Sequence, residues 1–131
     1  MNARGTFEVK LAPQSAVEGV GDPSIGRMAI DKRFSGDLEG TSRGQMLAAG
    51  TGVKGSAGYV AMEQVAGSIG GRSGTFALQH SGTMARGVPT LSVTVVPDSG
   101  TGELTGLTGA MSITIVDKKH FYEFDYTIDA R

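Results

Sequence analysis

The 131-residue sequence contains no cysteine. Without thiols the chain forms neither disulfide bonds nor thiolate metal sites, a composition that suits a reducing compartment. An excess of either charge is missing too, because 12 Lys and Arg residues are interspersed with 13 Asp and Glu residues. Such a balance offers no basic surface to nucleic acid or to anionic lipid. We therefore expect no nucleic-acid partner.

Long hydrophobic runs are also absent from the sequence. No apolar run approaches the roughly 18–20 residues that a membrane-spanning helix needs. The first residues lead directly into a strand-like pattern, without the apolar core of a signal peptide. We expect no membrane partner and a cytoplasmic location. The length fits a single domain over residues 1–131, which at this size buries about 65–70% of its unfolded surface.

Glycine is abundant and proline is scarce, with 21 and 4 residues respectively. The glycines follow no three-residue period, which excludes collagen, and apolar residues alternate regularly between them, which argues against disorder. Many glycines between short alternating runs favour a small β-barrel with tight turns and sharply bent strands.

The clearest alternation lies near the C-terminus. Between residues 122 and 128, aromatic or aliphatic side chains at every second position alternate with acidic or hydroxyl side chains. Period two is the signature of a strand with one buried face and one exposed face. The run 111–116 alternates in the same way, and a turn at 118–119 would pair Ile115 with Tyr122 on the buried face.

Eight alternating runs follow one another along the chain: 6–11, 28–34, 38–42, 61–69, 72–80, 91–95, 111–116 and 120–128. Two adjacent glycines at 70–71 suit a two-residue hairpin turn, because such turns need positive φ. That turn pairs Glu63 with Leu78 and Ala61 with His80. A turn at 86–87 similarly pairs His80 with Val93.

Eight strands in hairpin order predict an all-β fold, a single small antiparallel up-and-down barrel whose closure removes exposed sheet edges. A short loop at 35–37 would pair Lys32 with Gly40. The stretch 13–25 is expected to be an irregular loop. Residues 46–49 form the only patch with helical propensity, and it is too short to stand alone.

Seven segments spread in order over nearly the whole chain carry a family resemblance: Gly5–Val9, Phe34–Leu38, Gly44–Leu47, Gly55–Ala61, Leu78–Met84, Val95–Leu104 and Tyr122–Tyr126. They resemble a bacterial family of unknown function, DUF3224, and the resemblance implies an allene-oxide-cyclase-like barrel. Related barrels include enzymes that close rings in reactive lipids and binding proteins that add little chemistry. No motif here matches a cyclase catalytic residue, so the resemblance leaves the activity open.

The alternation places several polar side chains on the buried face of the barrel: Lys32, Ser42, Tyr59, Glu63, His80, His120, Tyr122 and Tyr126. Glu63 and His80 are diagonal neighbours on paired strands, with Cβ atoms about 7–8 Å apart or less. A buried charge costs several kcal/mol unless it is paired. These side chains should therefore contact one another or line a wet cavity.

Two interpretations of this set stay open. In the first, a satisfied buried network of Glu63 with His80 or Lys32 only fixes the strand register. In the second, Glu63 and His80 are candidate catalytic groups and the set binds a ligand, with these residues as contacts: Lys32, Ser42, Tyr59, Glu63, His80, Tyr122 and Tyr126. The absence of bulk at Gly40 and Gly44 indicates either a cavity or a sharply bent strand.

The resulting hypothesis is a barrel whose interior binds a small, largely apolar molecule. The acid–base chemistry most compatible with these groups is isomerisation or cyclisation without a cofactor. The alternative is a non-catalytic structural or interaction barrel with a packed interior, acting through its outer surface or through an interface between identical chains. We expect no metal, because the two histidines lie 40 positions apart without ligand spacing.

Overall fold

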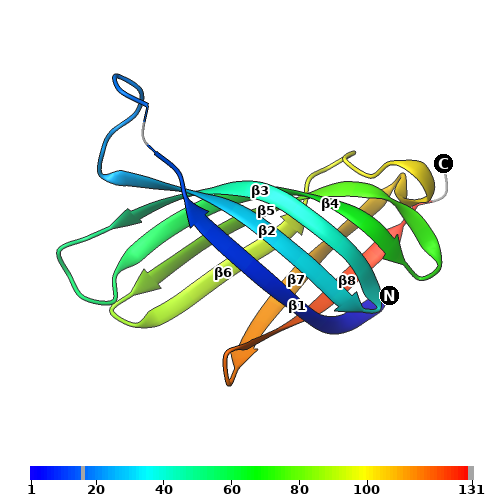
Figure 1. The fold of residues 1–131 in the computed structure, drawn as a ribbon. Coiled ribbons are helices and arrows are strands. Elements are labelled where there is room, and N and C mark those ends of the chain that lie inside the picture. The colour runs from blue at the N-terminus through cyan, green and yellow to red at the C-terminus, as the bar shows by residue number, and fades with distance from the viewer. Residues whose placement is uncertain (16, 130–131) are drawn as a thin grey trace.

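The computed structural model describes residues 1–15 and 17–129, which form one closed antiparallel barrel (Figure 1). Each strand pairs with the next, and β8 pairs with β1. The elements are β1 Asn2–Pro13, β2 Ile25–Gly36, β3 Leu38–Gly50, β4 Ala57–Ile69, β5 Arg72–Ala85, β6 Val88–Val95, the 3-10 turn η1 Gly102–Leu104, β7 Leu107–Val116 and β8 Lys119–Ile128. The expected eight-stranded, all-β barrel is confirmed.

Alternation along the strands builds the core. In β5, for example, Phe76, Leu78 and His80 are buried, whereas Gln79 and Ser81 are exposed. The inward side chains form one cluster of apolar residues: Ala3, Phe7, Phe34, Leu38, Val65, Ile69, Phe76, Leu78, Val93, Val95, Leu104, Leu107, Met111, Tyr122, Phe124 and Tyr126. No helix in the described part of the chain is long and apolar enough to cross a membrane.

The predicted register is confirmed around β5. Glu63 pairs with Leu78 and Ala61 with His80 across a turn whose two glycines have positive φ. His80 also pairs with Val93 of β6, as expected. The described residues between Pro13 and Ile25, 14–15 and 17–24, lie outside the strands, as predicted.

The predicted register is wrong by two residues at two hairpins. Lys32 pairs with Ser42 rather than Gly40, because β2 continues to Gly36 (φ 107°) and the chain turns at Asp37. The β7–β8 turn lies at 117–118, where both residues have positive φ, so that Ile113 rather than Ile115 faces Tyr122. A slip of two residues leaves each side chain on its predicted face.

The helical propensity of residues 46–49 has no structural counterpart, because this stretch lies within β3. Backbone pairing with both β2 and β4 there overrides the local preference. Gly40 and Gly44 mark a close approach of two strands and not a cavity. A Cβ atom at Gly44 would overlap the carbonyl oxygen of Met62, and one at Gly40 would overlap that of Ala66. Their lack of bulk allows β3 and β4 to approach closely.

The two ends of the barrel differ. One end, the floor, holds the beginning of β1, the end of β8 and η1 (Figure 1). Its buried side chains include Leu38, Ile69 and Leu104. There the Tyr122 hydroxyl accepts a hydrogen bond from the Leu38 N–H (2.9 Å) and lies 3.0 Å from the Ser35 carbonyl oxygen, to which it can donate. This side chain therefore ties β8 to the β2–β3 turn.

The opposite end, the mouth, is formed by the β1–β2 and β3–β4 loops and the β5–β6 and β7–β8 turns. Along the β6–β7 seam only Val93–Met111 and Thr94–Ala110 are paired. The mouth halves of these two strands diverge, and Figure 1 shows the β7–β8 hairpin pointing away from β6. The barrel is thus tightly closed at the floor and loosely closed at the mouth.

Removing the Tyr122 hydroxyl tests its role in closing the floor. Tyr122→Phe leaves the buried Leu38 N–H without its acceptor, so we expect the free energy of unfolding in urea to fall by about 1–3 kcal/mol. Tyr126→Phe is the matched control, because its hydroxyl makes no hydrogen bond to the described residues; it should change stability by about 0.5 kcal/mol or less. Equal, small effects of both variants would contradict this role.

Candidate functional site

Four polar side chains meet inside the barrel at mid-height, one from each of β2, β3, β4 and β5. The Glu63 carboxylate is their centre. Lys32 Nζ donates to Glu63 Oε2 (2.8 Å), and Ser42 Oγ donates to Oε1 (3.0 Å). His80 Nε2 lies 2.8 Å from Oε2. We call these residues the buried polar cluster. The expected contact between Glu63 and His80 is confirmed.

The cluster is removed from solvent. The Glu63 side chain is 0% exposed, that of His80 4% and that of Lys32 7%. The Lys32 ammonium also lies 4.8 Å from the centroid of the Phe7 ring and 5.8 Å from that of Phe34. Aromatic faces attract cations, so these rings add to the attraction from Glu63. Lys32 is therefore held by a carboxylate on one side and by two rings.

The His80 contact is short but poorly directed. Its Nε2 approaches Glu63 within 2.8 Å, yet the N–H does not point along the line to the oxygen as in a well-formed hydrogen bond. Lys32 approaches the same Oε2 atom. Lys32 therefore makes the hydrogen bond to this oxygen, and His80 is a close neighbour of it.

The electrostatics of the cluster keep Glu63 ionised. Burial raises the pKa of this carboxyl, but the His80 contact and the charge and hydrogen bond of Lys32 oppose burial and leave the pKa below its usual value. A carboxylate with a lowered pKa, two hydrogen-bond donors and a close imidazole is a weak proton acceptor. The geometry therefore favours Glu63 as an anchor for its neighbours more than as a general base.

Tyr59 lies next to the cluster on the mouth side. Its ring centroid is 6.5 Å from that of His80, and its ring covers the inner face of Gly82, where a Cβ atom would overlap it. Burial, and then the negative charge of Glu63, raise the pKa of the Tyr59 hydroxyl. Tyr59 is therefore a neutral hydroxyl between the cluster and the mouth.

A cavity of about 600 Å³ opens at the mouth above Tyr59. Its wall comes from β3, β4, β5, β6 and the β3–β4 loop: Met46, Ala48, Gly50, Thr51, Val53, Lys54, Gly55, Ser56, Ala57, Gly58, Tyr59, Gly82, Thr83, Met84, Pro89, Thr90 and Leu91. Its volume lies within the range typical of small-molecule sites, and most of its wall is apolar or small. We call it the mouth cavity.

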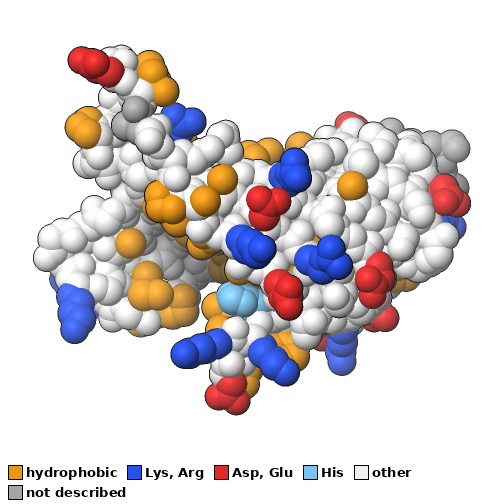
Figure 2. Space-filling view, viewed as in Figure 1, with side chains coloured by type: hydrophobic (Ala, Val, Ile, Leu, Met, Phe, Trp, Pro, Cys, Tyr) orange, Lys and Arg blue, Asp and Glu red, His pale blue; other side chains and the backbone are white. Residues whose placement is uncertain are grey.

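Among the mouth-cavity residues, the sequence analysis identified only Tyr59. A usable signal was present, because the inward positions at the mouth ends of β3, β4 and β5 include Ala48, Gly50, Ala57 and Gly82. Small residues at inward positions leave space at the end of long strands. In the space-filling view the surface is hollowed between the β7–β8 hairpin and the rest of the mouth, with apolar side chains beside the hollow (Figure 2).

The remaining predicted site residues lie elsewhere. Tyr122 and Tyr126 belong to the packed floor, where Tyr126 stacks on Phe124 with ring centroids 5.4 Å apart. The Tyr122 hydroxyl is hydrogen-bonded to the backbone on both sides of the β2–β3 turn. We therefore assign these two side chains to packing. His120 packs on Phe7 at the edge of the mouth, with ring centroids 5.0 Å apart.

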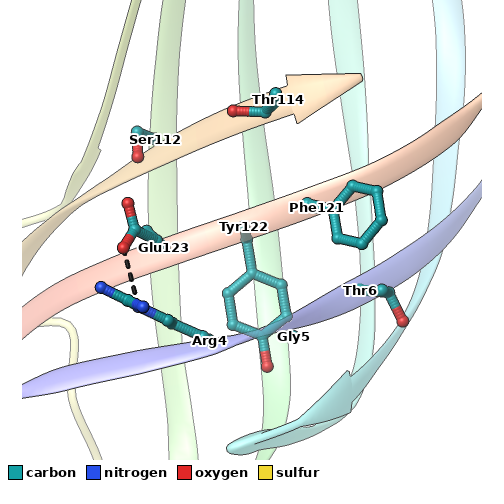
Figure 3. Close-up of a pocket in the computed structure, with 8 residues that line it drawn as sticks. All are labelled: Arg4, Gly5, Thr6, Ser112, Thr114, Phe121, Tyr122 and Glu123. Atoms are coloured by element: carbon teal, nitrogen blue, oxygen red, sulfur yellow. Dashed lines mark ion pairs between the residues drawn. The ribbon is translucent and has the colours of Figure 1, made fainter. Parts of the chain in front are cut away.

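A shallow hollow of about 470 Å³ lies on the outer face of β1, β7 and β8 (Figure 3). An ion pair between Arg4 Nε and Glu123 Oε1 (2.7 Å) spans it, and both side chains are at least half exposed. None of the buried polar cluster lines this hollow. The mouth cavity, in contrast, reaches the cluster through Tyr59, which lines it. The described residues contain no group of three or more His, Cys, Asp or Glu side chains placed to hold a metal ion.

The chain matches a known protein family over most of its length. A family model described as "Protein of unknown function (DUF3224)" matches residues 3–126. The chain belongs to the DUF3224 family. It is similar to a protein of unknown function from the same family in Shewanella oneidensis MR-1, known from a crystal structure, with 51% identity and a TM-score of 0.92. The match covers 100% of this chain and 98% of that one. No curated protein matches the sequence.

Replacing Glu63 tests whether the cluster of this DUF3224 barrel is a buried ion network. Glu63→Gln leaves the Lys32 ammonium buried without a counter-charge, and we expect a loss of about 3–5 kcal/mol of unfolding free energy at pH 7. Glu8→Gln, on the exposed face of β1, is the control and should have little effect. A loss below about 1 kcal/mol for Glu63→Gln would show a solvated rather than a buried cluster.

The same cluster predicts a pH dependence of stability. Because the Glu63 pKa is lower in the folded state, its contribution is complete above the unfolded value of about 4.3 and is lost as the pH falls through the folded pKa. The stability difference between wild type and Glu63→Gln should therefore shrink in acid. Urea unfolding at a series of pH values from neutral downward measures this, and a constant difference would contradict it.

Proposed function

We propose that the barrel binds a small, largely apolar molecule in the mouth cavity. The observation that carries this proposal is an apolar cavity of about 600 Å³ at the loosely closed end of the barrel. Two of its apolar side chains, Met84 and Leu91, are 43% and 44% exposed although they lie on inward positions. Covering them with an apolar ligand is favourable by about 25 cal/mol for each Å² removed from water.

The polar residues near the cavity give a ligand its orientation. Tyr59 forms part of the wall and offers a neutral hydroxyl, and His80 lies behind it in the cluster. Few polar groups in an apolar wall are typical of small-molecule sites. The sequence resemblance to allene-oxide-cyclase-like barrels, which include both enzymes and binding proteins, accords with an interior ligand. A cytoplasmic location also stays part of this proposal.

Conversion of the ligand by isomerisation or cyclisation would need Glu63 or His80 to exchange a proton with it. Glu63 is occupied by the hydrogen bonds of Lys32 and Ser42 and by the close His80 ring, and neither Glu63 nor His80 lines the mouth cavity. A general base must come within hydrogen-bond reach of the proton that it removes. The geometry of the barrel therefore supports binding more directly than catalysis.

The exposed outer face supports a second candidate function. Leu47 of β3 and Val60 of β4 are cross-strand partners that point outward, and they are 45% and 52% exposed. Met62 and Ile25 extend this apolar patch on β4 and β2. Apolar outer surfaces of this kind are typical of interfaces. In this alternative, a second copy of the chain packs against the patch and the barrel acts as an interaction protein.

A neutral fluorescent probe, N-phenyl-1-naphthylamine, tests the mouth cavity. Its fluorescence should rise on binding to the wild-type protein. Leu91→Glu puts a carboxylate into the apolar wall and should weaken binding by a factor of about ten or more. Leu47→Glu is the matched control, because Leu47 is equally exposed but lies on the outer face. Failure of the probe to bind, or equal loss in both variants, would contradict the proposed site.

The same two variants test the alternative in the opposite direction. If copies of the chain associate through the outer patch, the molar mass in solution should fall to that of one chain in Leu47→Glu and stay unchanged in Leu91→Glu. Light scattering after size-exclusion chromatography measures it. A wild-type protein that is already a single chain at high concentration would exclude this association.

A further inference from the structure

The part of the chain that forms the wall of the mouth cavity carries more basic than acidic residues. Between Gly40 and Pro97, which covers β4, β5, β6 and all of β3 except its first two residues, the sequence contains one acidic residue, Glu63, and four basic residues: Arg43, Lys54, Arg72 and Arg86. Glu63 is buried and occupied by Lys32, Ser42 and His80. The residues that line the cavity therefore offer a ligand no carboxylate.

Two of the four basic residues lie at the rim of the cavity. Lys54, in the β3–β4 loop, is one of its lining residues. Arg86 lies in the β5–β6 turn, which is joined to that loop by hydrogen bonds from the Arg86 N–H to Ser56 Oγ (3.0 Å) and from the Gly87 N–H to the Gly55 carbonyl (3.0 Å). Arg43, by contrast, pairs with Asp31 on the outer surface.

The rim cations are not neutralised by the protein. Neither Lys54 nor Arg86 makes an ion pair with any residue that the structure describes. The β3–β4 loop is also held in place, because Thr51 Oγ1 donates to the Ser56 carbonyl (2.9 Å) and the Ser56 N–H donates to the Val53 carbonyl (3.1 Å). A pre-ordered loop reduces the entropy that binding costs.

We propose that the ligand of the mouth cavity is an amphipathic anion, with an apolar body against the wall and one terminal carboxylate beside Lys54 at the rim. This inference rests on the proposed function and adds the polarity of the ligand to it. A neutral ligand of the same length gains the apolar contacts but leaves the rim charge unused. A cationic one is repelled by Lys54 and finds no acidic partner in the wall.

Three ligands with the same ten-carbon chain test the proposal: decanoate, 1-decanol and decylammonium, each below the concentration at which it aggregates. Each displaces N-phenyl-1-naphthylamine from the wild-type protein, and the displacement curve gives its affinity. We expect decanoate to bind about five times more tightly than decanol or better, and decylammonium to bind most weakly. The decanoate preference should decline as salt is raised, because about 1 M salt screens charges beyond about 3 Å.

Charge reversal at the rim supplies the decisive variant. Lys54→Glu should remove the preference for decanoate and leave decanol affinity within about a factor of two, since Lys54 is exposed in a loop. Arg72→Glu makes the same change in net charge at the turn on the floor and should retain the preference. Retention of the probe signal and of the thermal unfolding midpoint shows that each variant is folded.

The outcomes separate this inference from the proposed function. If the probe binds but decanoate shows no advantage over decanol, or keeps its advantage in Lys54→Glu, the anionic ligand is excluded and the apolar site stands. If Arg72→Glu abolishes the preference as fully as Lys54→Glu, overall charge and not the rim is responsible, which also overturns the inference. If the probe itself does not bind, the mouth cavity is not a ligand site.

Discussion

The ionised carboxylate of Glu63 is the constraint that sets how β2, β3, β4 and β5 are arranged at mid-height in the barrel. A fully buried charge is tolerated only when polar partners surround it. Here the hydrogen-bond donors Lys32 and Ser42 and the close His80 ring come from three other strands. Each partner must stand on the inward face at one height of the barrel. Shifting β2, β3 or β5 by one residue would turn its partner outward, so the carboxylate selects the register of four consecutive strands.

Close strand approach sets where this cluster lies. Gly44 pairs with Glu63, and any side chain there would overlap the backbone of β4. Gly40 and Gly67 face one another four residues nearer the floor, and a side chain at either would also overlap the backbone of the paired strand. The glycines let β3 and β4 approach each other closely beside the Glu63 side chain. Below them the interior is filled by aromatic and aliphatic side chains, and above them small inward residues leave the mouth cavity.

The sequence predicted the features that depend on local patterns. The contact of Glu63 with His80 followed from the alternation of two strands and from a glycine pair that fixes their turn. The two registers that were wrong depend on turn residues whose conformation is less restricted, at Asp37 and at Asp117–Lys118. Non-glycine residues seldom adopt positive φ, so the 117–118 turn gives no clear sequence signal. The mouth cavity was not predicted: small inward residues such as Ala48 and Gly82 were a signal for space, but the size of the cavity depends on how far β3 to β6 and the β3–β4 loop extend beyond the cluster.

The positions of the charges explain why the proposed binding at the mouth does not depend on the buried polar cluster. Inside, the negative charge of Glu63 meets Lys32 at 2.8 Å, so these two charges compensate each other. At the rim, Lys54 and Arg86 have no such compensation among the described residues. The paired charges of the interior therefore attract a charged ligand only weakly, whereas the unpaired cations Lys54 and Arg86 at the rim attract an anion. The proposed binding at the mouth therefore needs no change in the buried polar cluster, whose role is to hold four strands in register.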